Sequence, residues 1–236
     1  CSLGATSAND LAEATGFPMI ADAPSGLRRK ACANLISTAD ALLTGPLGQE
    51  QPELLIQIGA LPTSRVVYEY LDRQSCPWIV IEARSANHDF LHRASVVVQR
   101  ADCTALRELG RICAGGNNEW LRQWLSADQR ARERLRDAMV ACEWNEIIAA
   151  HLSVNADGFS AIHLASSMAI RHGNLHIFPS DTKQPIFSNR GVNGIDGTIG
   201  TFIGESLATG QRGLLLCGDL AFLHDLPALA AARAAK

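Results

Sequence analysis

The sequence has no apolar run approaching the roughly 20 residues that a membrane-spanning helix requires. Its first ten residues, CSLGATSAND, lack the charged and apolar regions of a signal peptide. It also lacks an excess of basic residues: the formal net charge is −3, and residues 151–236 carry six acidic side chains against six Lys and Arg. Without a basic face, neither nucleic acid nor an anionic membrane is an expected partner. These absences predict a cytoplasmic protein.

Cysteine and histidine spacing typical of metal sites is also missing. The seven cysteines are scattered, with no C-x-x-C pair and no histidine at metal-ligand spacing. Unpaired cysteine commonly behaves as a small buried hydrophobe. We therefore expect free, mostly buried thiols rather than a zinc site or a disulfide framework.

What the chain does have is an alternation of apolar strands and amphipathic helices, which is typical of an α/β protein with a parallel sheet. With 236 residues, 47% of them hydrophobic, it can bury one large core or two modest ones. The β-rich runs lie at 18–21, 54–59, 78–83 and 95–98, and the helical patterns at 5–15, 62–72 and 104–114. No G-x-G-x-x-G follows these strands, so a dinucleotide site is not expected. We predict a Rossmann-like domain over residues 1–125.

The start of one helix in this first domain suits an anion. After Gly59, the residues Pro62-Thr63-Ser64-Arg65 indicate a helix N-terminus with a cation beside it. An ordinary helix start with Arg65 in solvent explains the same pattern, and both interpretations stay open on the sequence alone.

A connecting helix and a second α/β region follow. Ser126 to Gln129 form a capping box, which predicts a helix over 126–151. Residues 152–236 then show a helical pattern at 161–173, β-rich runs at 175–178 and 186–188, and an apolar strand in LLLCGD at 214–219. The sequence thus predicts two α/β regions joined by a helix.

Two features of this second region favour a bound anionic ligand. Gly191, Gly194 and Gly197 recur every three residues, which lets the backbone approach a ligand closely, although tight turns also use glycine without binding anything. Asp219 ends the apolar strand, where α/β sheets bind ligands and where a carboxylate requires a cation or donors. Magnesium takes such a carboxylate together with phosphate oxygens, and Gly218 leaves room for a diphosphate.

Two arginines add fixed positive charge nearby. Arg171 and Arg190 can grip carboxylates bidentately. Ser167 lies four residues before Arg171, so on a helix both side chains would project from one face and address the same substrate group.

Together these residues carry a resemblance. The segments SSMAIR at 166–171, SNRGVNGIDG at 188–197 and GDLAFLHDL at 218–226, in this order and spacing, resemble the 2-succinyl-5-enolpyruvyl-6-hydroxy-3-cyclohexene-1-carboxylate (SEPHCHC) synthases of menaquinone and phylloquinone biosynthesis. GFPMIADAPSGLR at 16–28 is similar, less specifically, to that family's central domain. The resemblance implies a Rossmann-like central domain over 1–125, a connecting helix over 126–151, and over 152–236 the N-terminal part of the thiamine diphosphate-binding α/β domain.

The resemblance also implies a reaction. The family decarboxylates 2-oxoglutarate on thiamine diphosphate and adds the resulting four-carbon unit to isochorismate. Its cofactors are thiamine diphosphate and Mg²⁺, with Mn²⁺ as an alternative metal. The expected partners are therefore these two small molecules, and the expected assembly is a homodimer or homotetramer, because the family's active site lies between two subunits.

Residue by residue, the resemblance assigns the site. Arg190 and Arg171 match the arginines that grip the substrates, with Ser167 as a polar contact beside them, and these three are the candidate catalytic residues. Arg65 stands where the family commonly has a lysine near the substrate entrance. Ile195 matches the bulky residue under the bent cofactor. Asp219 matches the first metal ligand, and the diphosphate cradle corresponds to Gly218, Asp219, Leu220 and Ala221.

Departures from the wider pattern of thiamine diphosphate enzymes limit what this chain can do alone. Leu220 replaces the second glycine of the usual G-D-G, as in this family, and only 17 residues follow Asp219, too few to reach the asparagine pair that completes the metal site. The domain with the activating glutamate is also missing. The resemblance therefore predicts a fragment that is inactive in isolation.

Two other interpretations remain. One is a different thiamine diphosphate carboligase or decarboxylase, although pyruvate-specific relatives have less need of both Arg171 and Arg190. The other is a noncatalytic α/β binding module, which would be free to lose Asp219 or Arg190.

Overall fold

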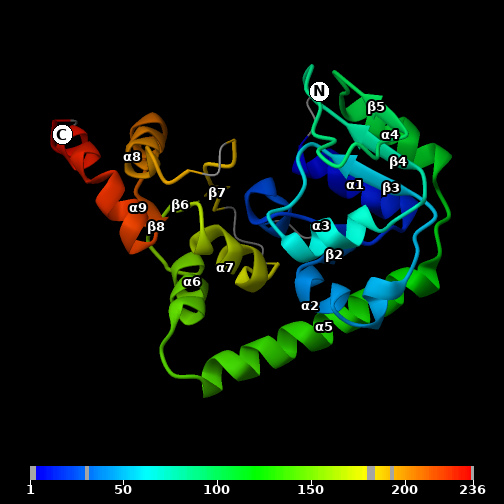
Figure 1. Cartoon of the computed structure of the whole chain (residues 1–236), viewed down its shortest axis with the longest axis horizontal. Helices are drawn as coiled ribbons and strands as arrows, with labels where there is room; N and C mark the ends of the chain where they lie inside the picture. The colour runs from blue at the N-terminus through cyan, green and yellow to red at the C-terminus, as the bar shows by residue number, and fades with distance from the viewer. Residues whose placement is uncertain (1–3, 30–31, 180–183, 192–193, 235–236) are drawn as a thin grey trace. The chain divides into compact units, whose positions relative to one another are not determined.

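The computed structural model describes residues 4–29, 32–179, 184–191 and 194–234 (Figure 1). Val192 and Asn193 of the glycine-rich motif therefore lie outside the described residues. The chain divides into two compact units. Unit 1 comprises Cys1–Asp22 and Ala31–Arg136, and unit 2 comprises Ala23–Lys30 and Asp137–Lys236. Every strand pair in both is parallel, which confirms the α/β prediction.

Unit 1 contains a parallel sheet in the order β3-β4-β5 and a two-stranded pair, β1-β2. Its strands are β1 (Met19–Ile20), β2 (Leu35–Ile36), β3 (Leu55–Ile58), β4 (Trp78–Ile81) and β5 (Val96–Val98). Its helices are α1 (Ala5–Thr15), α2 (Ala39–Leu43), α3 (Arg65–Asp72), α4 (Cys103–Ile112) and most of α5 (Asn118–Ala141), with a 3-10 turn at Pro46–Gln49. The last residues of α5, 137–141, belong to unit 2. The strands and the three helices expected in this region are all present, with ends shifted by a few residues.

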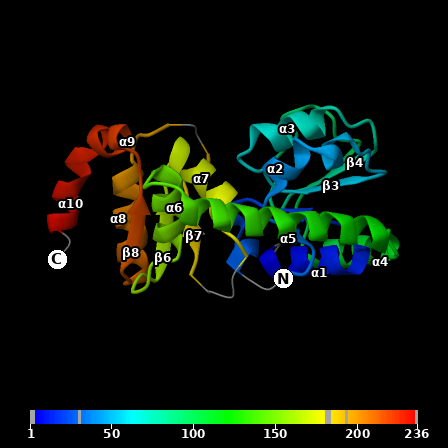
Figure 2. The same cartoon turned by 90° about the horizontal axis from the view of Figure 1, so that it is seen from below.

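Apolar side chains alternate along the strands of the β3-β4-β5 sheet, so both faces of the sheet are apolar and are covered by helices. Leu11 of α1 and Leu106 of α4 pack against Ile81, in a cluster with the other isoleucines of β3 and β4 that point the same way. Figure 2 shows α3 on the opposite side of these strands. A second core joins α2, α3 and α5 through Leu43, Val67 and Trp124.

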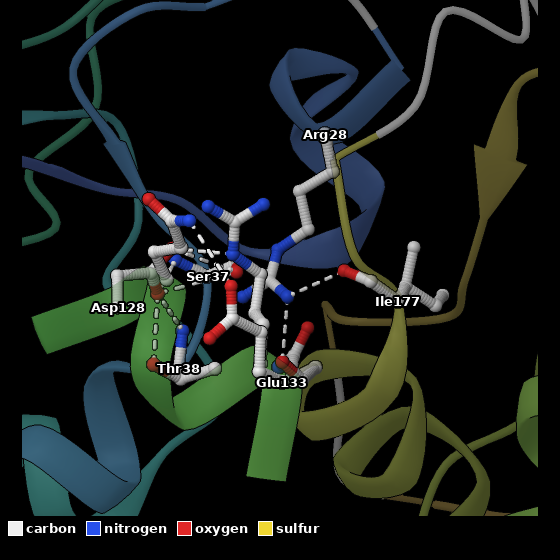
Figure 3. Close-up of polar contacts among 9 residues, drawn as sticks. Arg28, Ser37, Thr38, Asp128, Glu133 and Ile177 are labelled. Atoms are coloured by element: carbon white, nitrogen blue, oxygen red, sulfur yellow. Dashed lines mark hydrogen bonds and ion pairs between the residues drawn. The ribbon is translucent and has the colours of Figure 1, made fainter. Parts of the chain in front are cut away.

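A buried carboxylate fixes α5 to the loop that precedes α2. The side chain of Asp128 is fully buried, and its Oδ1 accepts hydrogen bonds from the backbone N–H groups of Ser37 and Thr38, each at 2.8 Å (Figure 3). The hydroxyl of Thr38 donates to the same oxygen, and Arg132 Nε lies 3.0 Å from Oδ2. Asp128 therefore has the donors that a buried carboxylate requires.

The single helix expected over 126–151 is wrong. Asn117 caps α5 well before Ser126, because its Oδ1 accepts from the N–H groups of Glu119 and Trp120. Ser126 lies inside α5, where its hydroxyl accepts from Arg130. The helix ends at Ala141, and Asn145 caps a separate helix, α6 (Glu146–Val154).

Unit 2 is built on a parallel sheet in the order β7-β6-β8. Its strands are β6 (Ala161–Leu164), β7 (Ile186–Phe187) and β8 (Gly213–Leu216). Besides α6, its helices are α7 (Met168–His176), α8 (Thr198–Thr209), α9 (Asp219–His224) and α10 (Leu229–Ala234), with 3-10 turns at Ala23–Ser25, Leu27–Arg29 and Leu226–Ala228.

The two faces of β6 meet different helices. Ile162 and Leu164 pack with Val154 of α6 and Ile170 of α7. The intervening His163 faces the other way, and its Nδ1 lies 2.9 Å from the carboxylate of Glu205 on α8. The strands thus lie between α6 and α7 on one face and α8 on the other (Figure 2).

The helix expected at 161–173 is right only from residue 168 onward, and the strand expected at 175–178 is wrong. Residues 161–164 form the central strand, and α7 continues to His176. Ile177 follows without joining a sheet, because its carbonyl accepts from the buried guanidinium of Arg28 at 3.0 Å and its N–H donates to Gly173 (Figure 3). The short apolar runs did not distinguish strand from helix.

In the described part of the chain, no helix is both long enough and apolar enough to span a membrane. Five cysteines of the described residues are free thiols, as expected: Cys32, Cys76, Cys113, Cys142 and Cys217. Four of them are only partly buried and Cys142 is exposed, so the expectation that these thiols are mostly buried is wrong. Cys103 is disulfide-bonded, which contradicts the expectation of free thiols throughout.

Candidate functional site

Three loops of unit 2 meet at one edge of its sheet. Because β6, β7 and β8 are parallel and in register, their carboxyl ends lie at the same edge. Ser166 and Ser167 follow β6, Asn189 and Arg190 follow β7, and Gly218 and Asp219 follow β8. The order β7-β6-β8 also means that the chain leaves β6 to one side and returns to its other side. In open α/β sheets, ligands bind at such reversals.

The loop after β6 presents Ser167 and Arg171. Ser167 is exposed and precedes α7 with φ 72° and ψ −130°, a region that a residue with a side chain seldom adopts. Arg171 lies in the first turn of α7, and its Nη1 donates to the carbonyl oxygen of Ser167 at 2.7 Å. The expectation that both side chains project from one helix face is wrong, because Ser167 lies before the helix and only its backbone carbonyl contacts Arg171.

Arg190, after β7, is a half-buried cation. Its guanidinium has no hydrogen-bond or ion-pair partner among the residues that the structure describes, so its donors can receive an anionic ligand. Neighbouring Asn189 is fixed on both sides: its carbonyl accepts from the hydroxyl of Ser166 at 3.2 Å, and its amide donates to Thr201. These bonds hold the β7 loop against the β6 loop and against α8.

The described end of the glycine-rich turn carries Ile195. Its side chain is half-buried, and its carbonyl accepts from the hydroxyl of Thr198 at 3.0 Å. Gly197, the last of the three glycines, has φ 64°, a left-handed conformation that favours glycine. The backbone conformation therefore explains why this position is glycine. The turn therefore holds Ile195 next to the start of α8.

Asp219 is the first residue of α9, rather than the last residue of the strand as expected, because β8 ends at Leu216. Its carboxylate is exposed, and its Oδ1 accepts from the N–H of Leu220 at 2.8 Å. No cation pairs with it among the described residues. Ala221 is buried and Leu220 is exposed, so α9 turns one side inward and leaves Asp219 open.

Cys217 precedes this loop but is not poised as a nucleophile. Burial raises the pKa of its thiol from the ordinary value of 9.0, so the reactive thiolate is scarce near neutral pH.

Arg65 lies in unit 1, whereas the other predicted site residues lie in unit 2. It is the first residue of α3, and Ser64 caps that helix by accepting from the N–H of Val67. The Arg65 side chain is 90% exposed and pairs with Glu69 at 2.6 Å on the same helix. These contacts match an ordinary helix start.

The edge of the unit 2 sheet fits part of a metal-diphosphate site. Asp219 offers hard oxygen ligands, and a Cβ added at Gly218 would meet nothing within 4 Å, so the backbone there is open to a ligand. The hydroxyl oxygen of Ser188 is buried without a hydrogen-bond partner among the described residues. In the same part of the chain, no three His, Cys, Asp or Glu side chains form a metal-binding group. Asp219 could therefore offer such a site only one of the ligands that a metal ion needs.

Sequence reasoning missed the small polar residues that support this edge. The loops are positioned by Ser166, Thr198 and Thr201, whose hydrogen-bond partners are other loop residues. Asp225 also belongs to this group, because its carboxylate accepts from the N–H of Gly200 on α8. Ser166 and Asp225 lie inside the motifs at 166–171 and 218–226, whereas Thr198 and Thr201 lie just beyond the motif at 188–197 and carry no such signal in the sequence.

No protein-family model matches the chain. Curated relatives that do match carry the name 2-succinyl-5-enolpyruvyl-6-hydroxy-3-cyclohexene-1-carboxylate synthase. The protein from Microcystis aeruginosa is 35% identical over 223 residues, covering 92% of this chain and 39% of its own length. The Myxococcus xanthus protein is 31% identical over 229 residues, covering 94% and 38%. The Acaryochloris marina protein is 35% identical over 233 residues, covering 91% and 38%. The chain thus spans about two-fifths of the length of these relatives.

Proposed function

We infer that the chain belongs to the SEPHCHC synthases and forms part of an enzyme that joins a decarboxylated 2-oxoglutarate unit to isochorismate. Similarity to proteins of that name over more than nine-tenths of the chain is the observation that carries the inference. Because about three-fifths of each relative lies outside the similarity, the activity belongs to a longer protein that contains this chain. The cytoplasmic setting and the homodimer or homotetramer remain predictions.

In this proposal, the edge of the unit 2 sheet holds thiamine diphosphate and Mg²⁺ or Mn²⁺. Asp219 supplies one carboxylate to the metal, and the backbone from Gly218 to Ala221 receives the diphosphate. The support for this is the open space at Gly218 and the exposed carboxylate of Asp219, which has no cation of its own among the described residues. Ile195 supports the bound cofactor from the neighbouring turn. When bound, the cofactor supplies the electron sink that decarboxylation needs.

The arginines bind the substrates, both of which carry carboxylates. Arg190 has guanidinium donors that no described residue uses, and a carboxylate can take two of them in parallel. Arg171 is exposed and oriented by the Ser167 carbonyl, so part of its donor set is fixed while the rest faces solvent. Ser167 adds a hydroxyl beside it. The role of Arg65 at the substrate entrance remains a prediction from the resemblance.

A related thiamine diphosphate enzyme for another 2-oxo acid is the second candidate. Two arginines near the same edge favour a substrate with an additional carboxylate, such as 2-oxoglutarate, over pyruvate.

The test is an assay of the full-length protein that contains this chain. With thiamine diphosphate, Mg²⁺ and isochorismate present, it should release carbon dioxide from 2-oxoglutarate and form the SEPHCHC adduct, and it should turn over pyruvate far more slowly. A preference for pyruvate would favour the second candidate. If no 2-oxo acid is consumed although the cofactor binds, the synthase assignment is wrong. The isolated 236-residue chain should show no decarboxylation in the same assay.

A further inference from the structure

The N-terminus of α8 is capped from another helix. Gly197 occupies the N-cap position with φ 64° and has no side chain to accept the N–H groups of the first turn. The N–H of Gly200, in that turn, donates instead to Oδ2 of Asp225 at 2.9 Å. A residue 25 positions later in the chain therefore supplies the cap that the left-handed glycine cannot.

Asp225 lies at the end of α9, the helix that begins with Asp219. It is the C-cap of α9, and its carbonyl also accepts from the N–H of Ala228 in the following 3-10 turn. The preceding residue, His224, places Nδ1 3.2 Å from the carboxylate of Asp196 in the glycine-rich turn. That second contact joins two largely exposed side chains, and such pairs contribute little. The Asp225 cap is the stronger of the two links.

The cap joins the two parts of the unit 2 edge to which we assign the cofactor. At one end, the short α9 connects Asp225 to Asp219, over about 9 Å for six residues at 1.5 Å each. At the other, α8 connects Gly200 to Thr198, whose hydroxyl holds the carbonyl of Ile195. A displacement of α9 would therefore shift Asp219 relative to Ile195.

We propose that Asp225 is a positioning residue that fixes the turn carrying Ile195 relative to the loop carrying Asp219, so that one diphosphate-containing cofactor can contact both. The inference rests on the proposed function. It assigns Asp225 no contact with cofactor or substrate. Its effect on binding passes through the hydrogen bond to Gly200.

Two ligands distinguish positioning from general loosening of the fold. In the proposed site, magnesium pyrophosphate would contact the Asp219 loop alone, whereas thiamine diphosphate would also contact the Ile195 turn. In the full-length protein, we expect Asp225→Ala to weaken thiamine diphosphate binding about tenfold by calorimetry, equal to about 1.4 kcal/mol. Binding of magnesium pyrophosphate should change by less than about twofold.

Three further variants test whether the loss of the Asp225 acceptor causes the weaker binding of thiamine diphosphate. Asp225→Asn keeps a good N-cap acceptor and should restore thiamine diphosphate affinity to within about twofold of the unmodified protein. Asp157→Ala removes an exposed carboxylate before β6 in the same unit and should have no effect. The nearly isosteric Asp225→Leu carries the same expectation as Asp225→Ala, so the test does not depend on one variant folding.

Two results would overturn the inference. One is that Asp225→Ala weakens the binding of both ligands equally, which would indicate that α9 as a whole is loosened. The other is that Asp225→Ala binds thiamine diphosphate as tightly as the unmodified protein does. Titration of the Asp219→Ala variant with the same ligands distinguishes failure of the positioning role of Asp225 from failure of the proposed cofactor site. If Asp219→Ala abolishes binding while Asp225→Ala does not weaken it, only the positioning role fails. If Asp219→Ala binds normally, the cofactor site itself is misassigned.

Discussion

At the scale of single residues, the proposed site depends on two charged side chains that the unit itself does not neutralise. Arg190 follows β7 and Asp219 follows β8, the two strands that flank β6 in the sheet, and neither side chain has an oppositely charged partner among the described residues. Charged side chains without partners contribute little to folding, so their presence at a ligand-binding edge is better explained by binding.

Replacing Arg190 with alanine in the full-length protein should weaken use of the carboxylate substrates and leave cofactor binding intact. A hydrogen bond to a charged group is worth about 1.5–3 kcal/mol, so kcat/KM should fall about ten- to hundredfold. Arg190→Lys keeps the charge without the bidentate geometry, so its kcat/KM should lie between those of the unmodified protein and Arg190→Ala. Arg233→Ala, an exposed arginine of the same unit, is the control. An unchanged kcat/KM for Arg190→Ala would remove its substrate role.

Residue types that carry charge were predictable from the sequence, but their surroundings were not. Asp219 and Arg190 stand out by type and by position after an apolar run. Ser166 does not, because its role comes from a hydrogen bond to the carbonyl of Asn189, which only the pairing of β6 with β7 brings near.

At the scale of elements, Asp128 links a helix to a distant loop in unit 1. We expect Asp128→Ala to lower the free energy of unfolding of the chain by about 3–5 kcal/mol, because it leaves the donors of Ser37 and Thr38 without their acceptor and Arg132 without its ion-pair partner. Denaturant unfolding measures the loss. Asp137→Ala removes an exposed carboxylate from the same helix and should change the free energy by less than about 0.5 kcal/mol. Equal stability of the two variants would contradict a structural role for the Asp128 network.

The α6–α7 region of unit 2 should lose stability in mild acid. Burial, and then the charges of His172 and His151, lower the pKa of His176 from 6.5 to about 4. Between pH 6.5 and about 4, His176 is protonated in the unfolded chain but stays neutral in the folded chain. The stabilising contribution is therefore present above pH 6.5 and is lost as the pH falls to about 4, and it reaches about 3 kcal/mol.

Unfolding of the His176→Gln variant at several pH values tests this. Its stability should fall less steeply between pH 6.5 and 4 than that of the unmodified chain. His92→Asn is the control, since His92 is exposed and asparagine tolerates its φ of 53°. If His176→Gln keeps the full pH dependence, another group is responsible.

Elements with a clear period were predictable, and short buried ones were not. The pattern at 5–15 gives α1 with the observed bounds. Residues 161–164 are all buried, and a fully buried strand shows no alternation that would distinguish it from a helix in the sequence. The break between α5 and α6 does not follow from the pattern at Ser126, because Asn117 and Asn145 provide the caps.

At the scale of the whole molecule, the fold gives two α/β units, and most of the predicted site residues fall in one of them. Unit 2 contains Ser167, Arg171, Arg190, Ile195 and the loop from Gly218 to Ala221, whereas Arg65 belongs to unit 1. The predicted class, with parallel sheets in both regions, is confirmed. The assignment of residues 1–125, 126–151 and 152–236 to particular domains of the synthases stays a prediction, and so do the site residues themselves.

Binding of a metal-diphosphate cofactor at this sheet edge should depend on Asp219. Calorimetric titration of thiamine diphosphate, with Mg²⁺ present, into the full-length protein and its Asp219→Ala and Asp157→Ala variants measures that dependence. We expect saturable binding to the unmodified protein and to Asp157→Ala, and no measurable binding to Asp219→Ala. Equal affinity of all three proteins for thiamine diphosphate would contradict this expectation.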